Sequence, residues 1–153
     1  MLSKKKDTTQ RSMFFGLEDT LNQKHPMYIL ANKVNWQLFE DSFSPLYCSD
    51  NGRPAKAIRL MVGLLILKHL RNISDQSVVE QWSENVYYQY FCSQKEFITV
   101  LLCEASELVH FSHRIGESCI ELILKESIRI NCNVSNDSIA SVTLLFMRII
   151  SLF

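Results

Sequence analysis

The sequence predicts an all-α protein, a compact bundle of about six short helices that includes a helix-turn-helix-like pair. Apolar residues recur at spacings of three and four, which is the period of an amphipathic helix. Only 4 of the 153 residues are Gly and 3 are Pro, which excludes turn-dense β architectures. Residues that cap or end helices separate the periodic segments.

The chain is expected to form one domain with a tail at each end. A length of 153 residues suits a single domain, and 47% hydrophobic residues is too apolar for a disordered chain. Residues 1–12 are polar and basic without periodicity, and we expect them to be disordered. Residues 13–131 hold the periodic segments of the helical domain. Residues 132–153 change abruptly from Asn- and Ser-rich to apolar and form an atypical tail.

The first two helices follow from their starting residues. Pro26 is suited to the first position of a short helix, because its φ angle is already helical. Asn35 is placed to cap a second helix. Trp36, Phe39 and Phe43 of that helix fall on one face, and a Ser-Pro pair then ends it.

The most regular helix begins at Ile58 and is apolar on several sides, so we expect it to be central. Gly63 in its interior costs roughly 1 kcal/mol relative to Ala, which indicates a close helix crossing. Asn72 ends this helix, and Ser74 is placed to cap the next one. Because about three residues separate the two helices, they should form a tight helix-turn-helix unit.

The remaining elements are less regular. Residues 86–91 are expected to be a further helical piece, and residues 93–102 an irregular segment, although 97–102 has β propensity. Two more helical segments follow, one ending at Gly116 and one over 117–130.

No membrane, redox or secretion signal is found. The five cysteines include no C-x-x-C pair, so we expect reduced thiols. The apolar runs 60–67 and 139–153 are too short to span a bilayer, and no signal-peptide core follows the N-terminal lysines. We therefore expect a cytoplasmic protein without a membrane anchor.

No catalytic residue is predicted, because the motifs of P-loop proteins, serine hydrolases and zinc proteases are absent from the sequence. His110 and His113 are spaced for a metal, but no acid or cysteine completes a ligand set. The sequence therefore predicts no metal, no cofactor and no small-molecule substrate.

A basic run is the strongest candidate site. Residues 1–77 hold 11 Lys and Arg against 7 Asp and Glu, whereas residues 78–153 hold 5 against 9. Five cations lie within 19 residues that contain no acid: Arg53, Lys56, Arg59, Lys68 and Arg71. Cations along one helix and the preceding loop match the spaced phosphates of a DNA duplex. The alternative is a solvated helix face, in which Lys68 and Arg71 complement the helix C-terminus.

The run from Gly52 to Phe91 resembles the N-terminal region of bacterial DDE-type insertion-sequence transposases, the InsH-like group of the "five" family. It reads GRPAKAIRLMVGLLILK over 52–68, continues with SD at 74–75, VVEQW at 78–82 and EN at 84–85, and closes with YYQYF at 87–91. The resemblance resumes with CEAS at 103–106 and HRIG at 113–116, and covers residues 14–131 in all.

The resemblance implies a role in DNA transposition. Such enzymes bind the terminal inverted repeats of their element through the N-terminal region. They cut and join strands with a DDE triad and two Mg²⁺ ions on a following RNase-H-like domain. Asp137, after residue 131, lacks the Thr-Thr-Val that follows the first catalytic Asp in this family. We therefore expect a truncated or frame-shifted fragment that is not an enzyme, with Mg²⁺ needed only by the missing domain.

The expected partner is double-stranded DNA of the element ends, with self-association or binding to the full-length transposase as a second option. Two alternatives stay open. The chain could be a protein–protein module, in which Trp36, Trp82 and residues 87–91 form an apolar surface. It could also be the non-functional product of a pseudogene.

Overall fold

The fold is all-α, as the sequence predicts. The computed structural model describes residues 16–47 and 56–132, and every regular element within these ranges is a helix. The predicted disordered tail 1–12 and the tail after Cys132 lie outside the described residues. The elements are α1 (Leu17–Thr20), α2 (Pro26–Lys33), α3 (Trp36–Phe43), the 3-10 helix η1 (Ser44–Leu46), α4 (Ile58–Arg71), α5 (Asp75–Glu84), α6 (Val86–Phe91) and α7 (Ala105–Cys132).

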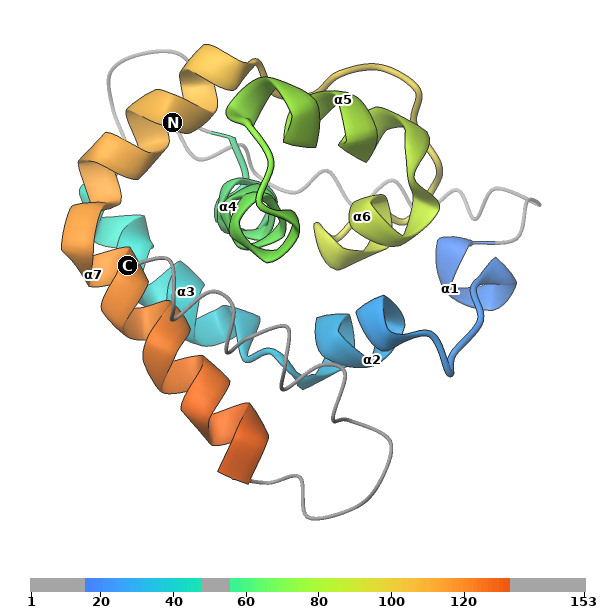
Figure 1. Cartoon of the computed structure of the whole chain (residues 1–153), viewed down its shortest axis with the longest axis horizontal. Helices are drawn as coiled ribbons and strands as arrows, with labels where there is room; N and C mark the ends of the chain where they lie inside the picture. Colours follow the sequence, from blue (N-terminus) through green and yellow to red (C-terminus); the bar gives the residue numbers. More distant parts are fainter. Residues whose placement is uncertain (1–15, 48–55, 133–153) are drawn as a thin grey trace.

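Helix α4 is the centre of the bundle. It is seen nearly end-on in Figure 1, with α5 and α6 on one side and α3 and α7 on the other. Of its 14 residues, 10 are buried. Burial on several sides follows from its sequence, in which apolar residues cover more than one face, and the predicted central helix is confirmed.

Gly63 marks a close crossing of α4 with the end of α6, as predicted. A Cβ atom at Gly63 would lie 2.7 Å from Cys92 Sγ and 3.6 Å from the Phe91 ring. Only glycine therefore allows α6 to approach this closely.

The turn between α4 and α5 is built by the two residues predicted for it. Asn72 adopts the left-handed conformation (φ 53°, ψ 52°), which ends α4. The Ser74 hydroxyl accepts a hydrogen bond from the Ser77 backbone N–H at 3.1 Å and so caps α5. The predicted pair of helices joined by a tight turn is therefore present.

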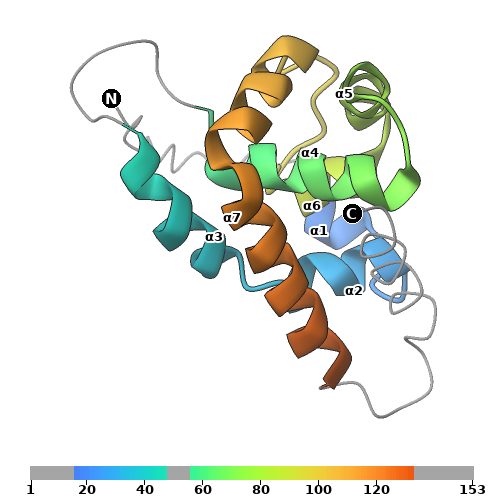
Figure 2. The same ribbon diagram turned by 60° about the vertical axis from the view of Figure 1, so that its left-hand side comes forward.

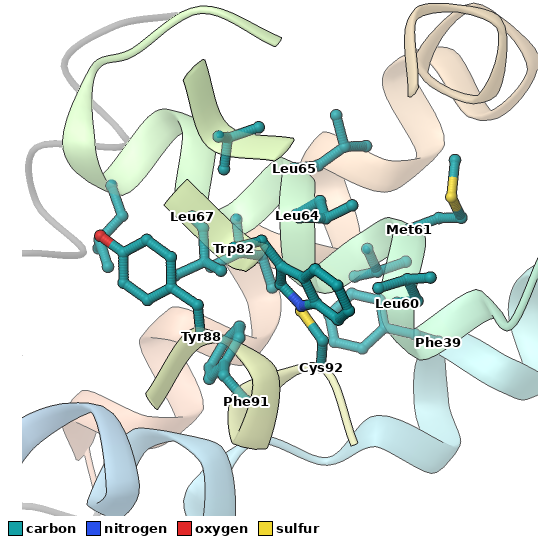
Figure 3. Packing of buried hydrophobic residues seen from close by; sticks show 14 of the residues in the cluster. Phe39, Leu60, Met61, Leu64, Leu65, Leu67, Trp82, Tyr88, Phe91 and Cys92 are labelled. Atoms are coloured by element: carbon teal, nitrogen blue, oxygen red, sulfur yellow. The ribbon is translucent and has the colours of Figure 1, made fainter. Parts of the chain in front are cut away.

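The apolar surface considered for Trp36, Trp82 and residues 87–91 is largely absent, because most of these side chains are buried and Trp36, Tyr87 and Tyr90 are partly buried. Trp82 is 2% exposed and Phe91 0% exposed, and Figure 3 shows both packed with Cys92 beside the apolar residues of α4. Trp36 is partly buried against the same core, with its ring 4.9 Å from the Phe91 ring. These large rings contribute to the stability of the bundle, because each buries a large apolar area.

The segment between α6 and α7 is irregular, as predicted, because a buried side chain holds it. Gln89 is fully buried, accepts a hydrogen bond from the Ile98 backbone N–H at 2.8 Å, and donates to the carbonyls of Ile98 and Trp82. This pairing satisfies the backbone of Ile98 without a partner strand. Phe97, Val100 and Leu101 remain exposed on the segment.

Helix α7 is interrupted at Gly116, whose backbone is non-helical (φ 46°, ψ −139°), as the predicted stop and restart require. Figure 2 shows α7 running from the level of α4 and α5 down to α2 and α3. There the Asn35 backbone N–H donates to Glu126, and Arg129 donates to the Lys33 carbonyl. Asn35 does precede α3, but its side chain makes no capping bond among the described residues, so the predicted cap is wrong in mechanism.

Candidate nucleic-acid interface

The predicted basic run does not form one free cationic surface. Arg53 lies outside the described residues, and the other four members contact their own chain. Residues that lie close together in the sequence therefore have different partners in the structure.

Lys56 and Arg59 hold the start of α4 to the rest of the bundle. The Lys56 ammonium donates to the Leu102 carbonyl and lies 3.9 Å from the Glu107 carboxylate. Arg59 Nε donates to the Phe91 carbonyl at 3.2 Å, and its guanidinium lies 4.5 Å from the centre of the Trp36 ring. Burial lowers the pKa of Arg59 from its ordinary value. Both cations thus have structural partners.

Lys68 and Arg71 lie at the C-terminal end of α4. The Lys68 ammonium donates to both oxygens of Asp75, at 2.9 Å and 2.8 Å, and so bridges the turn to α5. Arg71 is exposed, with its guanidinium 5.8 Å from the centre of the Tyr88 ring, and makes no ion pair with the described residues. Of the four described cations, Arg71 keeps its guanidinium N–H groups free for a ligand.

Helix α5 is poorly suited to contact DNA, although it is the second helix of the helix-turn-helix-like pair. It carries Asp75, Glu80 and Glu84 and neither Lys nor Arg. Because Lys68 pairs with Asp75, the charges of α5 that would repel a phosphate backbone are Glu80 and Glu84.

Two pairs of stacked aromatic rings join α2 to α6, which lie one above the other in Figure 1. The His25 ring lies 3.8 Å from that of Tyr87, and the Tyr28 ring 4.9 Å from that of Tyr90. The Tyr90 hydroxyl also contacts the Asn32 side chain at 3.2 Å. The sequence analysis does not predict this site, although the sequence holds two signals for it. Residues 20–39 contain no acid. His25 and Tyr28 are three residues apart, and so are their stacking partners Tyr87 and Tyr90.

His25 links this face to Arg71. Its Nδ1 accepts a hydrogen bond from the Met27 backbone N–H at 3.2 Å, which caps the start of α2. Burial lowers the pKa of His25, and the nearby positive charge of Arg71 lowers it further. The neutral ring therefore carries its proton on Nε2.

No catalytic or metal-binding cluster is found in the part of the chain that the structure describes. His110 and His113 are both exposed, and no three His, Cys, Asp or Glu side chains converge there. Burial raises the pKa of the Cys92 thiol to about 12 and that of Cys103 to about 11. Both thiols are therefore protonated and unsuited to nucleophilic or metal chemistry. None of the helices in ranges 16–47 and 56–132 is both long and apolar enough to cross a membrane.

The profile of the transposase domain family DUF772 matches residues 15–114, from α1 into α7. The chain belongs to this family. The DUF772 match confirms the resemblance to transposases that the 52–91 motifs indicate.

A relative from Rhizobium meliloti, an "Uncharacterized protein ORF8 in nfe locus", is 39% identical over 112 residues, which are 73% of this chain and 54% of the relative. The chain thus spans about half the length of the curated relative it matches. No solved structure shows significant similarity.

Proposed function

We propose that this DUF772 chain binds DNA in the cytoplasm as the N-terminal part of a transposase and recognises the terminal inverted repeats of its element. The family match over residues 15–114 is the observation that carries the proposal, because transposition requires that the protein engage element DNA. Arg71 also supports the proposal, because it is exposed, makes no ion pair with the described residues, and lies beside the acid-free segment 20–39.

We also propose that the chain does not cut or join DNA. A two-metal site needs acidic residues held at fixed positions, and such triads stand on a sheet. The regular elements of residues 16–47 and 56–132 are all helical, and residues 132–153 lack the family's first Asp motif. Mg²⁺ is then required only by the catalytic domain of the full-length enzyme.

The test is a fluorescence-anisotropy titration of the full chain with duplexes from the two ends of its element and with a scrambled duplex. If about three side chains contact phosphates, a plot of the logarithm of the binding constant against the logarithm of the salt concentration should have a slope of about −2.7. Tighter binding to the end sequences would support repeat recognition. Absence of salt-dependent binding to any duplex would refute the proposal.

Strand transfer is assayed on the same duplexes with Mg²⁺ or Mn²⁺. We expect no product. Metal-dependent product that a chelator abolishes would overturn the assignment as a non-catalytic fragment.

Self-association, or binding to the full-length transposase, is the second candidate. The exposed side chains of Phe97, Val100 and Leu101 favour it, because Gln89 and Lys56 hold their segment in place. Sedimentation velocity separates the two functions, since an apolar contact between copies responds little to salt, whereas a DNA complex dissociates as salt rises.

A further inference from the structure

We infer that the phosphate backbone of duplex DNA lies against the α2–α6 face, defined by the stacked pairs His25–Tyr87 and Tyr28–Tyr90 together with Asn32 and Arg71, and flanked in sequence by Lys24 and Lys33 at the two ends of α2. The inference rests on the proposed function and assigns DNA to a surface that shares only Arg71 with the predicted basic run. It also excludes α5 as the helix that contacts DNA.

The charge of this face is positive. Residues 20–39 contain Lys24 and Lys33 and no acid, and α6 carries no charged residue. Lys24, Lys33 and Arg71 make no ion pair with the described part of the chain. Lys24 and Lys33 lie more than 35 residues before Arg71, so of these three cations the predicted basic run contains only Arg71.

The acids at the border of the face do not cancel this charge. Asp75 is neutralised by Lys68, and Glu126 by Arg129. Glu18 of α1 is near enough for its charge to act on Tyr90, so it flanks the face. The acids that flank the face are Glu18 and the exposed Glu84, which precedes the α6 cap Asn85, against the three unpaired cations Lys24, Lys33 and Arg71.

The size of α2 suits a phosphate backbone. Its eight residues extend about 12 Å, and phosphates of one strand advance about 3.4 Å along the duplex axis. The helix thus spans three to four nucleotides, with Lys24 just before its start and Lys33 at its end. Cations at this separation can contact phosphates that are not neighbours.

The polar groups of the face are suited to phosphate oxygens. His25 accepts at Nδ1, so its Nε2–H is a donor, and the Asn32 amide N–H groups are typical phosphate partners, because the Tyr90 hydroxyl donates to Asn32 Oδ1 and leaves these N–H groups to a ligand. The Tyr88 ring holds the Arg71 guanidinium without using its N–H groups. The stacked rings fix these groups before binding, which lowers the entropy lost when DNA binds.

The experiment compares Lys24→Glu/Arg71→Glu with the control Lys95→Glu/Arg114→Glu in the full chain, in which Arg114 lies over the Tyr47 ring as Arg71 lies over the Tyr88 ring. Both double variants change the net charge equally, and all four residues are exposed. We expect the first to weaken binding to duplex DNA by about 60-fold near 0.1 M salt and to reduce the steepness of the salt dependence by about 1.8, because two phosphate contacts are lost. The control should change affinity by less than about 3-fold.

Two further variants keep the result interpretable. Lys24→Arg/Arg71→Lys retains both charges and should bind within about 3-fold of the wild type. If the first double variant is unfolded by circular dichroism, Lys24→Glu alone should still weaken binding by about 8-fold, the effect of one phosphate contact.

The outcomes separate the inference from the proposed function. Wild-type protein that binds no duplex refutes the proposed function. Wild-type protein that binds, with equal losses in the α2–α6 variant and the control, refutes the placement of DNA on this face and leaves the DNA-binding function standing.

Discussion

Gly63→Ala should destabilise the protein, although glycine in a helix interior is usually worse than alanine. The new Cβ atom would lie 2.7 Å from Cys92 Sγ, well inside contact distance. Alanine gains about 1 kcal/mol in helix propensity, and forcing an extra carbon into a packed core costs about 1–3 kcal/mol. The free energy of unfolding should therefore fall by up to about 2 kcal/mol.

Removing the sulfur should reverse the sign. In a Cys92→Ala background, the nearest remaining atoms to the new Cβ lie 3.6 Å away, which is ordinary contact. Gly63→Ala should then raise the free energy of unfolding by about 0.5–1 kcal/mol. The two substitutions should thus be coupled by about 1–3 kcal/mol, far from additive.

The measurement is urea unfolding of the wild type, both single variants and the double variant, followed by far-UV circular dichroism in the presence of a reductant. Similar m-values across the four proteins are needed for the comparison. A coupling below about 0.5 kcal/mol would mean that the helices separate freely at this point, and would refute the close-crossing argument.

Three other predictions concern ionisable groups. The pKa of His25 lies below its ordinary value of 6.5 in the folded protein, so the unfolded state binds the proton first, and stability should fall as pH drops from about 8 to about 5. His25→Asn keeps a capping residue and should remove that share of the pH dependence in thermal melts; an unchanged pH profile would contradict this. Glu126→Gln should lower the free energy of unfolding by about 1.5–3 kcal/mol, because a side chain that is 3% exposed loses its charged hydrogen bonds with Arg129. A chemical-denaturation midpoint within error of the wild type would refute this prediction. Cys92 and Cys103 should resist a thiol reagent at neutral pH in the native protein and react on unfolding, since burial holds both pKa values far above neutrality; rapid native labelling of either would show that the core opens there.

Much of the fold could be predicted because its signals are local. Apolar periodicity predicts the central helix, while Pro26, Asn72 and Ser74 predict helix ends through their own backbone preferences. The sequence analysis does not predict helix α1, because a helix of four residues is too short to show the helical period of apolar residues. It is held from a distance instead, by the bond from the Leu17 backbone N–H to the Lys95 carbonyl.

The candidate site was harder to predict because tertiary contacts decide which of the cations are paired and which remain available to a ligand. The basic run is continuous in sequence, yet Lys56 finds its partner 46 residues away and Arg59 finds one 32 residues away. A linear pattern shows that cations are close together but not which of them are already paired. The acid-free segment 20–39 and the aromatic spacings mark each half of the α2–α6 face in the sequence, but they do not show that Tyr90 meets Asn32 across 58 residues.

The bonds of Glu126 and Arg129 to the α2–α3 junction set the order in which the domain is completed during synthesis. Asn35 is separated from Glu126 by 91 residues, and the Lys33 carbonyl from Arg129 by 96. A growing chain emerges from the ribosome N-terminus first. The α2–α3 junction therefore cannot form these bonds until nearly all of the described chain has been translated. Until then the Asn35 backbone N–H and the Lys33 carbonyl lack these partners, and nascent chains shorter than this should be more susceptible to proteases than the finished domain.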